Sequence, residues 1–199
     1  VTGYTGHDAA KLRDYNENNH ALSGKEMIEA VKGAVATNEV NAAMGIICAT
    51  PTAGSSGTIP GVLFKLEKTH DLTEDQMIDF LFTSALFGRV VANNASVAGA
   101  TGGCQAEVGS ASAMAAAASV AIFNGTPEQS GHAMALAISN LLGLVCDPVA
   151  GLVEIPCVMR NAIGSGNALI SADLALAGVE SRIPVDEVIG AMDRVGRNL

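Results

Sequence analysis

Apolar residues recur every three or four positions in several segments of this sequence, as they do on one face of an α-helix. The spacing is clear in residues 27–35, 77–87, 133–141 and 184–192. Residues 106–124 are instead small or apolar on nearly every side, which is typical of a helix buried at the centre of a domain. These patterns predict four to seven helices, with an Ala-rich helix in the middle.

Three predicted helix starts carry the capping-box signature, in which a Ser or Thr precedes a Glu or Gln by three residues. The pairs are Ser23 with Glu26, Thr73 with Gln76, and Thr126 with Gln129, the last with Pro127 at the first helical position. No alternation of apolar and polar residues is long enough for a strand, and the nearest candidate, residues 144–155, contains proline and glycine. The sequence therefore predicts an all-α fold, a single compact helical domain.

Glycine-rich turns separate the predicted helices, at residues 51–61, 99–103, 147–156 and 164–166. Loops of this kind often carry the functional residues of a helical scaffold. The first turn concentrates hydroxyl and backbone N–H groups, and such a loop can wrap a small anion. It lacks the lysine of a nucleotide-binding phosphate loop, so a small carboxylate is the favoured ligand. A solvent-exposed Ser/Gly turn is the structural alternative.

Composition narrows the class of protein. The 199 residues are 49% hydrophobic and contain no Trp, so one core packed mainly from aliphatic side chains is expected. A formal net charge of −9 offers no footprint for nucleic acid or an anionic membrane. The longest apolar stretch, residues 111–123, is too short to cross a bilayer. Residues 1–20 are polar without a signal-peptide pattern, and the cysteines lack the spacing of a disulfide framework, so we expect a cytoplasmic protein.

Three of the four cysteines, Cys104, Cys146 and Cys157, lie where glycine or proline interrupts the backbone. A thiolate held at such a position can point at a metal, whereas a thiol inside a helix usually fills space. Three sulfurs would leave one corner of a four-iron cluster open. Their spacing matches neither the paired cysteines of zinc ribbons nor the tight runs of ferredoxins, so spacing alone favours three buried small apolar side chains. Cys48 lies in an apolar run, residues 44–49, and is expected in the core.

Other polar residues give weaker signals. Glu107 follows Cys104 by three positions and Asp147 adjoins Cys146, so either could take up a proton or make a structural hydrogen bond. The paired Asn93 and Asn94 could cap a helix or bind a substrate. The histidines are expected to be ordinary surface residues; they are His7, His20, His70 and His132.

Four long motifs cover most of the chain in order, at residues 37–45, 49–60, 102–110 and 146–157. Together they resemble the alpha subunit of iron–sulfur-dependent L-serine dehydratase. The resemblance implies that Cys104, Cys146 and Cys157 hold a 4Fe-4S cluster whose fourth iron is open. That iron would act as a Lewis acid on the serine hydroxyl in a reaction that yields pyruvate and ammonia. The resemblance also implies that one loop helps to hold the serine carboxylate, through Thr52, Ala53, Gly54 and Ser55.

Partners are implied by the same resemblance. Family members pair this domain with a beta domain or subunit carrying a Ser/Gly/His-rich motif, and this sequence has no such motif. We therefore expect L-serine as substrate, a beta subunit as partner and a higher oligomer of alpha–beta pairs. Family alpha subunits extend beyond both ends of this sequence, so residues 1–199 are expected to be a fragment with little activity alone. The catalytic base stays unassigned.

Three alternative functions remain at this point. A cysteine desulfidase-like lyase shares related cluster motifs and would release sulfide from cysteine. A structural zinc or redox module would use the same thiols without dehydrating serine. A non-catalytic helical interaction subunit would dock a partner through its Ala-rich faces and bind no metal.

Overall fold

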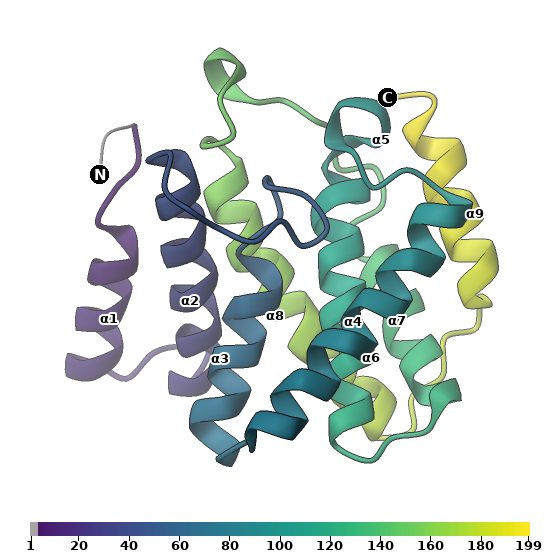
Figure 1. The fold of residues 1–199 in the computed structure, drawn as a ribbon, viewed down its shortest axis with the longest axis horizontal. Coiled ribbons are helices and arrows are strands. Elements are labelled where there is room, and N and C mark those ends of the chain that lie inside the picture. Colours follow the sequence, from purple (N-terminus) through teal and green to yellow (C-terminus); the bar gives the residue numbers. More distant parts are fainter. Residues whose placement is uncertain (1–3) are drawn as a thin grey trace.

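The structure is a computed structural model that describes residues 4–199, so Val1, Thr2 and Gly3 of the predicted polar leader lie outside it. This described part contains helices and no strands, which confirms the all-α prediction (Figure 1). The long helices are α1 (Asp8–Asn18), α2 (Lys25–Ala42), α3 (Thr58–His70), α4 (Glu74–Asn94), α6 (Ser110–Ile122), α7 (Pro127–Ser139), α8 (Cys157–Leu176) and α9 (Val185–Gly196). Three short elements complete the list: α5 (Gly99–Cys104), the π-helical turn η1 (Gln105–Gly109) and the 3-10 turn η2 (Val149–Gly151).

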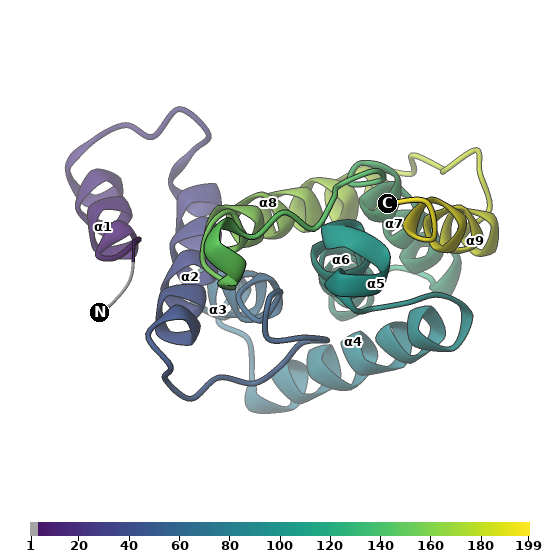
Figure 2. The same ribbon diagram turned by 90° about the horizontal axis from the view of Figure 1, so that it is seen from above.

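Helix α6 lies at the centre of the fold. Figure 2 shows it surrounded by α4, α7 and α8, and these are the helices against which it packs most extensively. Every residue from Ser110 to Val120 is buried. The small alanine side chains allow neighbouring helix backbones to approach closely on all sides, which confirms the Ala-rich central helix. The π-helical turn before it was not foreseen.

Two of the three predicted capping boxes are present. Thr73 and Thr126 each accept a hydrogen bond from the backbone N–H three residues later, and the glutamine there bonds back to the cap. The prediction for Ser23 is wrong, because α2 begins at Lys25 and Ser23 makes no capping bond. Gly24 stands between them with φ of +86°, a backbone conformation that turns the chain away from the helix axis.

The predicted count of four to seven helices is too low, because three of the eight long helices of the described residues, α1, α3 and α8, escaped prediction. Helix α1 forms within the polar leader. It buries no residue, and its sequence has no clear apolar stripe that would have predicted it. The turn predicted at residues 51–61 ends early, since α3 begins at Thr58. The turn predicted at residues 164–166 lies inside α8. A Cβ at Gly164 would come within 2.8 Å of Val108 and Thr58 side-chain atoms, so this glycine permits close helix packing rather than a turn.

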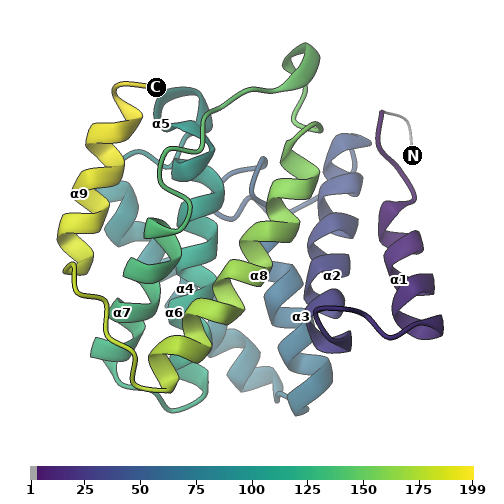
Figure 3. The same cartoon turned by 180° about the vertical axis from the view of Figure 1, so that it is seen from behind.

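The starts of α3 and α8 and the π-helical turn lie toward the same end of the molecule. Figure 3 shows α8 running from this end across the back of the fold, against α2 on one side and α6 and α7 on the other. The predicted glycine-rich loops at residues 51–57, 99–103 and 147–156 also gather there (Figure 1). In the part of the chain described, no helix combines the length and hydropathy needed to cross a membrane.

The crossing of α2 and α3 depends on the absence of a side chain at Gly61. A Cβ there would lie 2.7 Å from the Ala30 carbonyl oxygen and 2.9 Å from the Ala34 Cβ. We expect Gly61→Ala to lower the free energy of unfolding by about 1–3 kcal/mol, because the two helices must move apart. Urea unfolding followed by circular dichroism measures the change.

The matched control is Gly131→Ala in α7, where a new Cβ would meet nothing closer than Val185 at 4.0 Å. This variant should keep or gain stability, by up to about 1 kcal/mol, because alanine restricts the unfolded chain more than glycine does. Equal stability of the two variants would contradict the role given to the α2–α3 contact.

Candidate functional site

The structure brings the segments that carry Cys104, Cys146 and Cys157 to one end of the molecule. Cys104 ends α5 and Cys157 is the first residue of α8, and both are buried. Cys146 lies in the loop between α7 and α8 and is exposed. Gly103, with φ of +76°, breaks the helix just before Cys104. A Cβ at Gly103 would lie 2.6 Å from the Leu144 carbonyl oxygen, so the loop that leads to Cys146 passes directly against this glycine.

Gln105 fastens that loop beside Cys104. Its backbone N–H donates to the Leu144 carbonyl oxygen at 3.0 Å, and its side-chain oxygen accepts from the Gly143 N–H at 2.9 Å. The side-chain nitrogen donates to the Met192 carbonyl oxygen at 2.9 Å, so the amide also joins α9. Gln105 is fully buried, and its bonds therefore face no competition from water.

Arg160 joins the three cysteine segments from within α8. It lies three residues after Cys157, and its Nη1 donates to the Cys104 Sγ at 3.0 Å and to the Val145 carbonyl oxygen at 2.9 Å. The same nitrogen is 2.6 Å from the Asp147 carboxylate. Sequence reasoning missed this residue. Its position one helical turn after a candidate ligand was the available signal.

These contacts change the acidity of the thiols. The Cys157 thiol, as a hydrogen-bond partner, lowers the pKa of Cys104 to about 7, and Arg160 adds to this effect while burial opposes it. The pKa of Cys157 is raised, first because its proton is shared with Cys104 and then because of burial. Burial raises the pKa of Cys146, and negative charge on Cys104 and Glu107 raises it further. One thiolate therefore forms near neutral pH, on Cys104.

The hydroxyl and glycine loop at residues 50–57 rests on Glu107, which lies in the π-helical turn. The Thr52 hydroxyl donates to Glu107 Oε1 at 2.8 Å and lies 3.1 Å from the Ser55 hydroxyl. A Cβ at Gly54 would be only 2.8 Å from Glu107 Oε2. The Ala53 carbonyl oxygen accepts from the Asn41 side chain at 3.0 Å. The predicted loop residues and Glu107 thus form one cluster.

Asn161, which sequence reasoning also missed, holds this loop to α8. Its Oδ1 accepts from the N–H groups of Gly57 and Thr58, each at 3.1 Å, and from the Thr58 hydroxyl at 3.0 Å. Its Nδ2 donates to the Gly54 carbonyl oxygen at 2.7 Å and to the Cys157 carbonyl oxygen at 2.9 Å. A single buried amide therefore sets the distance between the loop and the first turn of α8.

Several other predicted residues lie outside this cluster. Asp147 pairs with Arg160, its side chain is 53% exposed, and within residues 4–199 it makes no hydrogen bond to the loop at residues 50–57. The prediction that Cys48 lies in the core is wrong: its thiol is exposed, because residues 45–49 form an extended connection on the surface. Asn94 caps the end of α4, donating to the Val90 carbonyl oxygen at 2.8 Å. Three histidines are exposed as expected: His7, His20 and His70. The fourth, His132, is half-buried.

Cysteine thiolates are the usual ligands of iron–sulfur clusters. Among residues 4–199, no three His, Cys, Asp or Glu side chains are grouped closely enough to hold one ion. A 4Fe-4S cluster makes a different demand, because each cysteine binds a separate iron atom and the ligands stand further apart. Three free thiols on three segments, with an N–H donor to the Cys104 sulfur, have the chemistry of such a ligand set.

Comparison with known proteins connects this geometry to a family. The family described as "Serine dehydratase alpha chain" matches residues 1–199. A probable L-serine dehydratase alpha chain of Bacillus subtilis is 64% identical over 198 residues, which are 100% of this chain and 66% of that protein. One from Latilactobacillus sakei is 68% identical over 173 residues, 87% of this chain and 83% of the relative. The L-serine dehydratase alpha chain of Peptoniphilus asaccharolyticus is 50% identical, and the match covers 96% of this chain and 65% of that protein.

The low pKa of Cys104 is testable in the metal-free protein. Thiolate absorbance in the ultraviolet, titrated under anaerobic conditions, should show a first step at about pH 7. Cys157→Ala removes the hydrogen bond that contributes most to the shift, so the step should move to higher pH. Arg160→Met should move it in the same direction by a smaller amount, because a positive charge and an N–H donor are lost.

Arg182→Met is the matched control, since Arg182 is 89% exposed and, within residues 4–199, forms an ion pair with Glu180 alone. It should leave the titration unchanged. A first step that stays at the same pH in both the Cys157 and the Arg160 variants would contradict the assignment.

Proposed function

The chain belongs to the serine dehydratase alpha-chain family, and from this premise we propose that its protein converts L-serine to pyruvate and ammonia. The chain spans about two thirds of the length of the Bacillus and Peptoniphilus relatives, at 66% and 65%. One observation carries the proposal on the structural side: the Glu107 carboxylate contacts the hydroxyl and glycine loop at residues 50–57 and acts electrostatically on Cys104.

The loop has the free donors that a substrate carboxylate needs. The backbone N–H groups of four consecutive residues make no hydrogen bond within the described part of the chain; they belong to Thr52, Ala53, Gly54 and Ser55. Two of these residues, Gly54 and Ser55, are buried, where an unpaired N–H costs free energy. A carboxylate placed over the loop would accept from several of these groups at once. We propose that serine binds here through its carboxylate.

Glu107 is the residue of this chain best placed to take the α-proton of serine. Its carboxylate contacts the same loop, through Thr52 and beside Gly54. A carboxylate within reach of a carbon acid can act as a general base. Asp147, the other candidate, is ion-paired with Arg160 at 2.6 Å and turned toward solvent. We therefore propose Glu107 rather than Asp147 as the base.

Cys104, Cys146 and Cys157 are the residues that would hold a 4Fe-4S cluster. When bound, this cluster would supply an open iron as a Lewis acid, which makes the serine hydroxyl a better leaving group. Arg160 would hold the Cys146 loop in place and offset part of the thiolate charge through its bond to Cys104. Once water and the α-proton have left, the resulting enamine can tautomerise and hydrolyse to pyruvate and ammonia without a further protein group.

A second subunit would complete the site. The three relatives described above are all named as alpha chains, and Cys146 is exposed on the surface of this chain. We propose that a beta partner covers the Cys146 side and that alpha–beta pairs assemble further.

Cys48 is a second exposed thiol, and free surface thiols are typical of a reducing compartment, so we place the protein in the cytoplasm.

Substitution of Gly54 tests the carboxylate loop. In Gly54→Ala the new Cβ would lie 2.8 Å from Glu107 Oε2, so the loop and the carboxylate must separate. We expect the KM for serine to rise by about tenfold or more, because misplaced binding groups lose much of their effect. Iron content should stay normal. Steady-state pyruvate formation by the complex with its beta partner measures the change, with Gly131→Ala as control.

An unchanged KM in Gly54→Ala would refute the loop assignment. The same assay run with cysteine in place of serine separates this function from the cysteine desulfidase alternative. Faster pyruvate and sulfide release from cysteine would favour that alternative.

Substitution of Cys146 tests the cluster. Cys146→Ser should lose iron, inorganic sulfide and serine turnover together, because a serine oxygen is a poor ligand for this kind of cluster. Anaerobic iron and sulfide analysis and the visible spectrum report cluster content independently of activity. Cys48→Ser is the matched control, since Cys48 is also exposed and lies apart from the cluster of cysteine segments. An iron-free Cys146→Ser protein with normal activity would contradict the proposal, and colourless wild-type protein with bound zinc would favour the zinc module.

A further inference from the structure

A cavity lies far from the cysteines, and the proposed reaction makes no use of it. Its volume is about 380 Å³, which is within the usual range for small-molecule sites. Residues from α2, α3, α6 and α8 line it. Cys157 begins α8 and Asp173, which lines the cavity, lies in its last turn, so roughly 24 Å of helix separate the two.

Lys65 is the buried charge of this cavity. Its side chain is only 9% exposed, and its ammonium lies 3.1 Å from a Glu26 carboxylate oxygen that is itself on a largely exposed side chain. An ammonium group has three N–H donors, and this ion pair is its one polar contact within residues 4–199. Burial of an incompletely bonded charge costs free energy, and oxygen atoms of a ligand would remove that cost.

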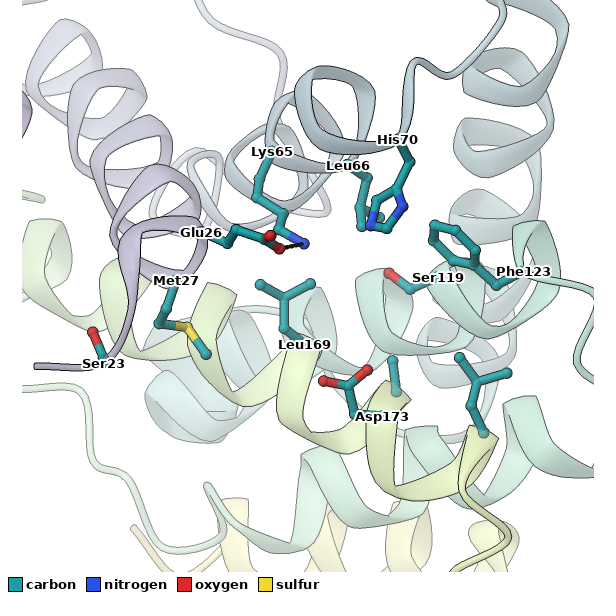
Figure 4. A pocket seen from close by; sticks show the side chains of 12 residues that line it. Ser23, Glu26, Met27, Lys65, Leu66, His70, Ser119, Phe123, Leu169 and Asp173 are labelled. Atoms are coloured by element: carbon teal, nitrogen blue, oxygen red, sulfur yellow. Dashed lines mark ion pairs between the residues drawn. The ribbon is translucent and has the colours of Figure 1, made fainter. Parts of the chain in front are cut away.

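Negative charge faces the same cavity from another helix. Figure 4 shows Lys65 entering from α3 and Asp173 from α8, with Leu169 between them. The Asp173 carboxylate makes no hydrogen bond or ion pair within the described residues. His70 lies at the rim, where its ring packs edge-on against Phe123 with centroids 4.8 Å apart.

The two signs of charge select the chemistry of the ligand. A ligand with only a negative charge would bind Lys65 but meet the carboxylates of Glu26 and Asp173. A ligand with only a positive charge would be repelled by the buried ammonium. A zwitterion can present a carboxylate to Lys65 and an ammonium to Asp173 at the same time.

Ser23, His70 and Ser119 also line the cavity, and the Ser119 hydroxyl already donates to the Ala115 carbonyl oxygen. The remaining part of the wall is apolar. It is formed by Met27, Leu66, Phe123, Leu169, Ala172 and Leu176. Such a wall favours a hydrocarbon side chain over a polar one, because burial of apolar surface is favourable and buried polar groups need partners.

We propose that this cavity binds a free α-amino acid with an aliphatic side chain, its carboxylate on Lys65 and its ammonium on Asp173. This site is separate from the cysteines and does not rest on the proposed serine reaction. Its ligand class follows from the buried lysine, the facing carboxylate and the apolar wall.

Three probes of nearly equal shape test the proposal by isothermal titration calorimetry on the purified protein with any subunit that co-purifies. L-Leucine carries both charges, isocaproate lacks the ammonium, and isopentylamine lacks the carboxylate. We expect saturable binding of leucine at millimolar concentrations or below. Each singly charged probe should bind at least about tenfold more weakly, because one charge-assisted hydrogen bond is lost.

Variants locate the site. Lys65→Met keeps the length of the side chain and should weaken leucine binding by about tenfold or more. Lys68→Met is the matched control, because Lys68 lies on the same helix, is 63% exposed and does not line this cavity. Asp173→Asn changes an exposed side chain, so its folding should be normal even if Lys65→Met folds poorly. In Asp173→Asn the preference for leucine over isocaproate should largely disappear.

Absence of saturable leucine binding, or equal binding of leucine and isocaproate by the wild-type protein, would overturn the proposal. Leucine binding that persists unchanged in Asp173→Asn would also overturn it. Neither result affects the serine dehydratase assignment, which depends on the cysteines and Glu107.

Discussion

The first turn of α8 is the constraint on which the candidate site depends. Cys157, Arg160 and Asn161 lie within five consecutive residues, and each reaches a different part of the site. Arg160 holds the Cys104 sulfur and the Cys146 loop, while Asn161 holds the loop that rests on Glu107. The loops have little regular structure of their own. Their relative positions are therefore set by hydrogen bonds to one rigid helix, which is how an irregular site acquires a defined geometry.

The buried central helix explains why α8 can serve as that reference. Helix α6 is buried along almost its whole length and packs against α8, so the two helices cannot shift without opening the alanine-rich core. The π-helical turn continues α6 toward the site and carries Glu107. One of the two carboxylate candidates is thus part of the core helix itself, whereas Asp147 lies on a loop. Helical placement gives Glu107 a fixed position relative to Cys104.

The sequence allowed prediction of the features that depend on local patterns. Periodic apolar residues, an all-round apolar segment and two Thr–Gln capping boxes identified most of the helices. Cys104, Cys146, Cys157 and the hydroxyl loop were identified as candidates from motifs. Asn161 was missed, because an asparagine in a helix gives no local sign of a partner that is distant in sequence. Arg160 was missed although it lies one helical turn after Cys157, because that spacing does not reveal its contacts with Cys104 and the Cys146 loop. Cys48 was misplaced for a related reason: hydrophobicity favours burial, but tertiary packing decides whether a connecting segment has anything to cover it.

The balance of charge around the three thiols supports the metal cluster proposed at this place. Glu107 raises the pKa of every cysteine in the group, and a thiolate on Cys104 raises the pKa of the other two. Arg160 is the nearby cation that offsets this, and it stabilises mainly the first thiolate. Two of the three thiols are therefore held protonated by their neighbours. A cationic group between the sulfurs would reverse that effect, because its charge would stabilise all three thiolates at once. The negative charge of Glu107, which otherwise raises the pKa values of the thiols, would attract such a group.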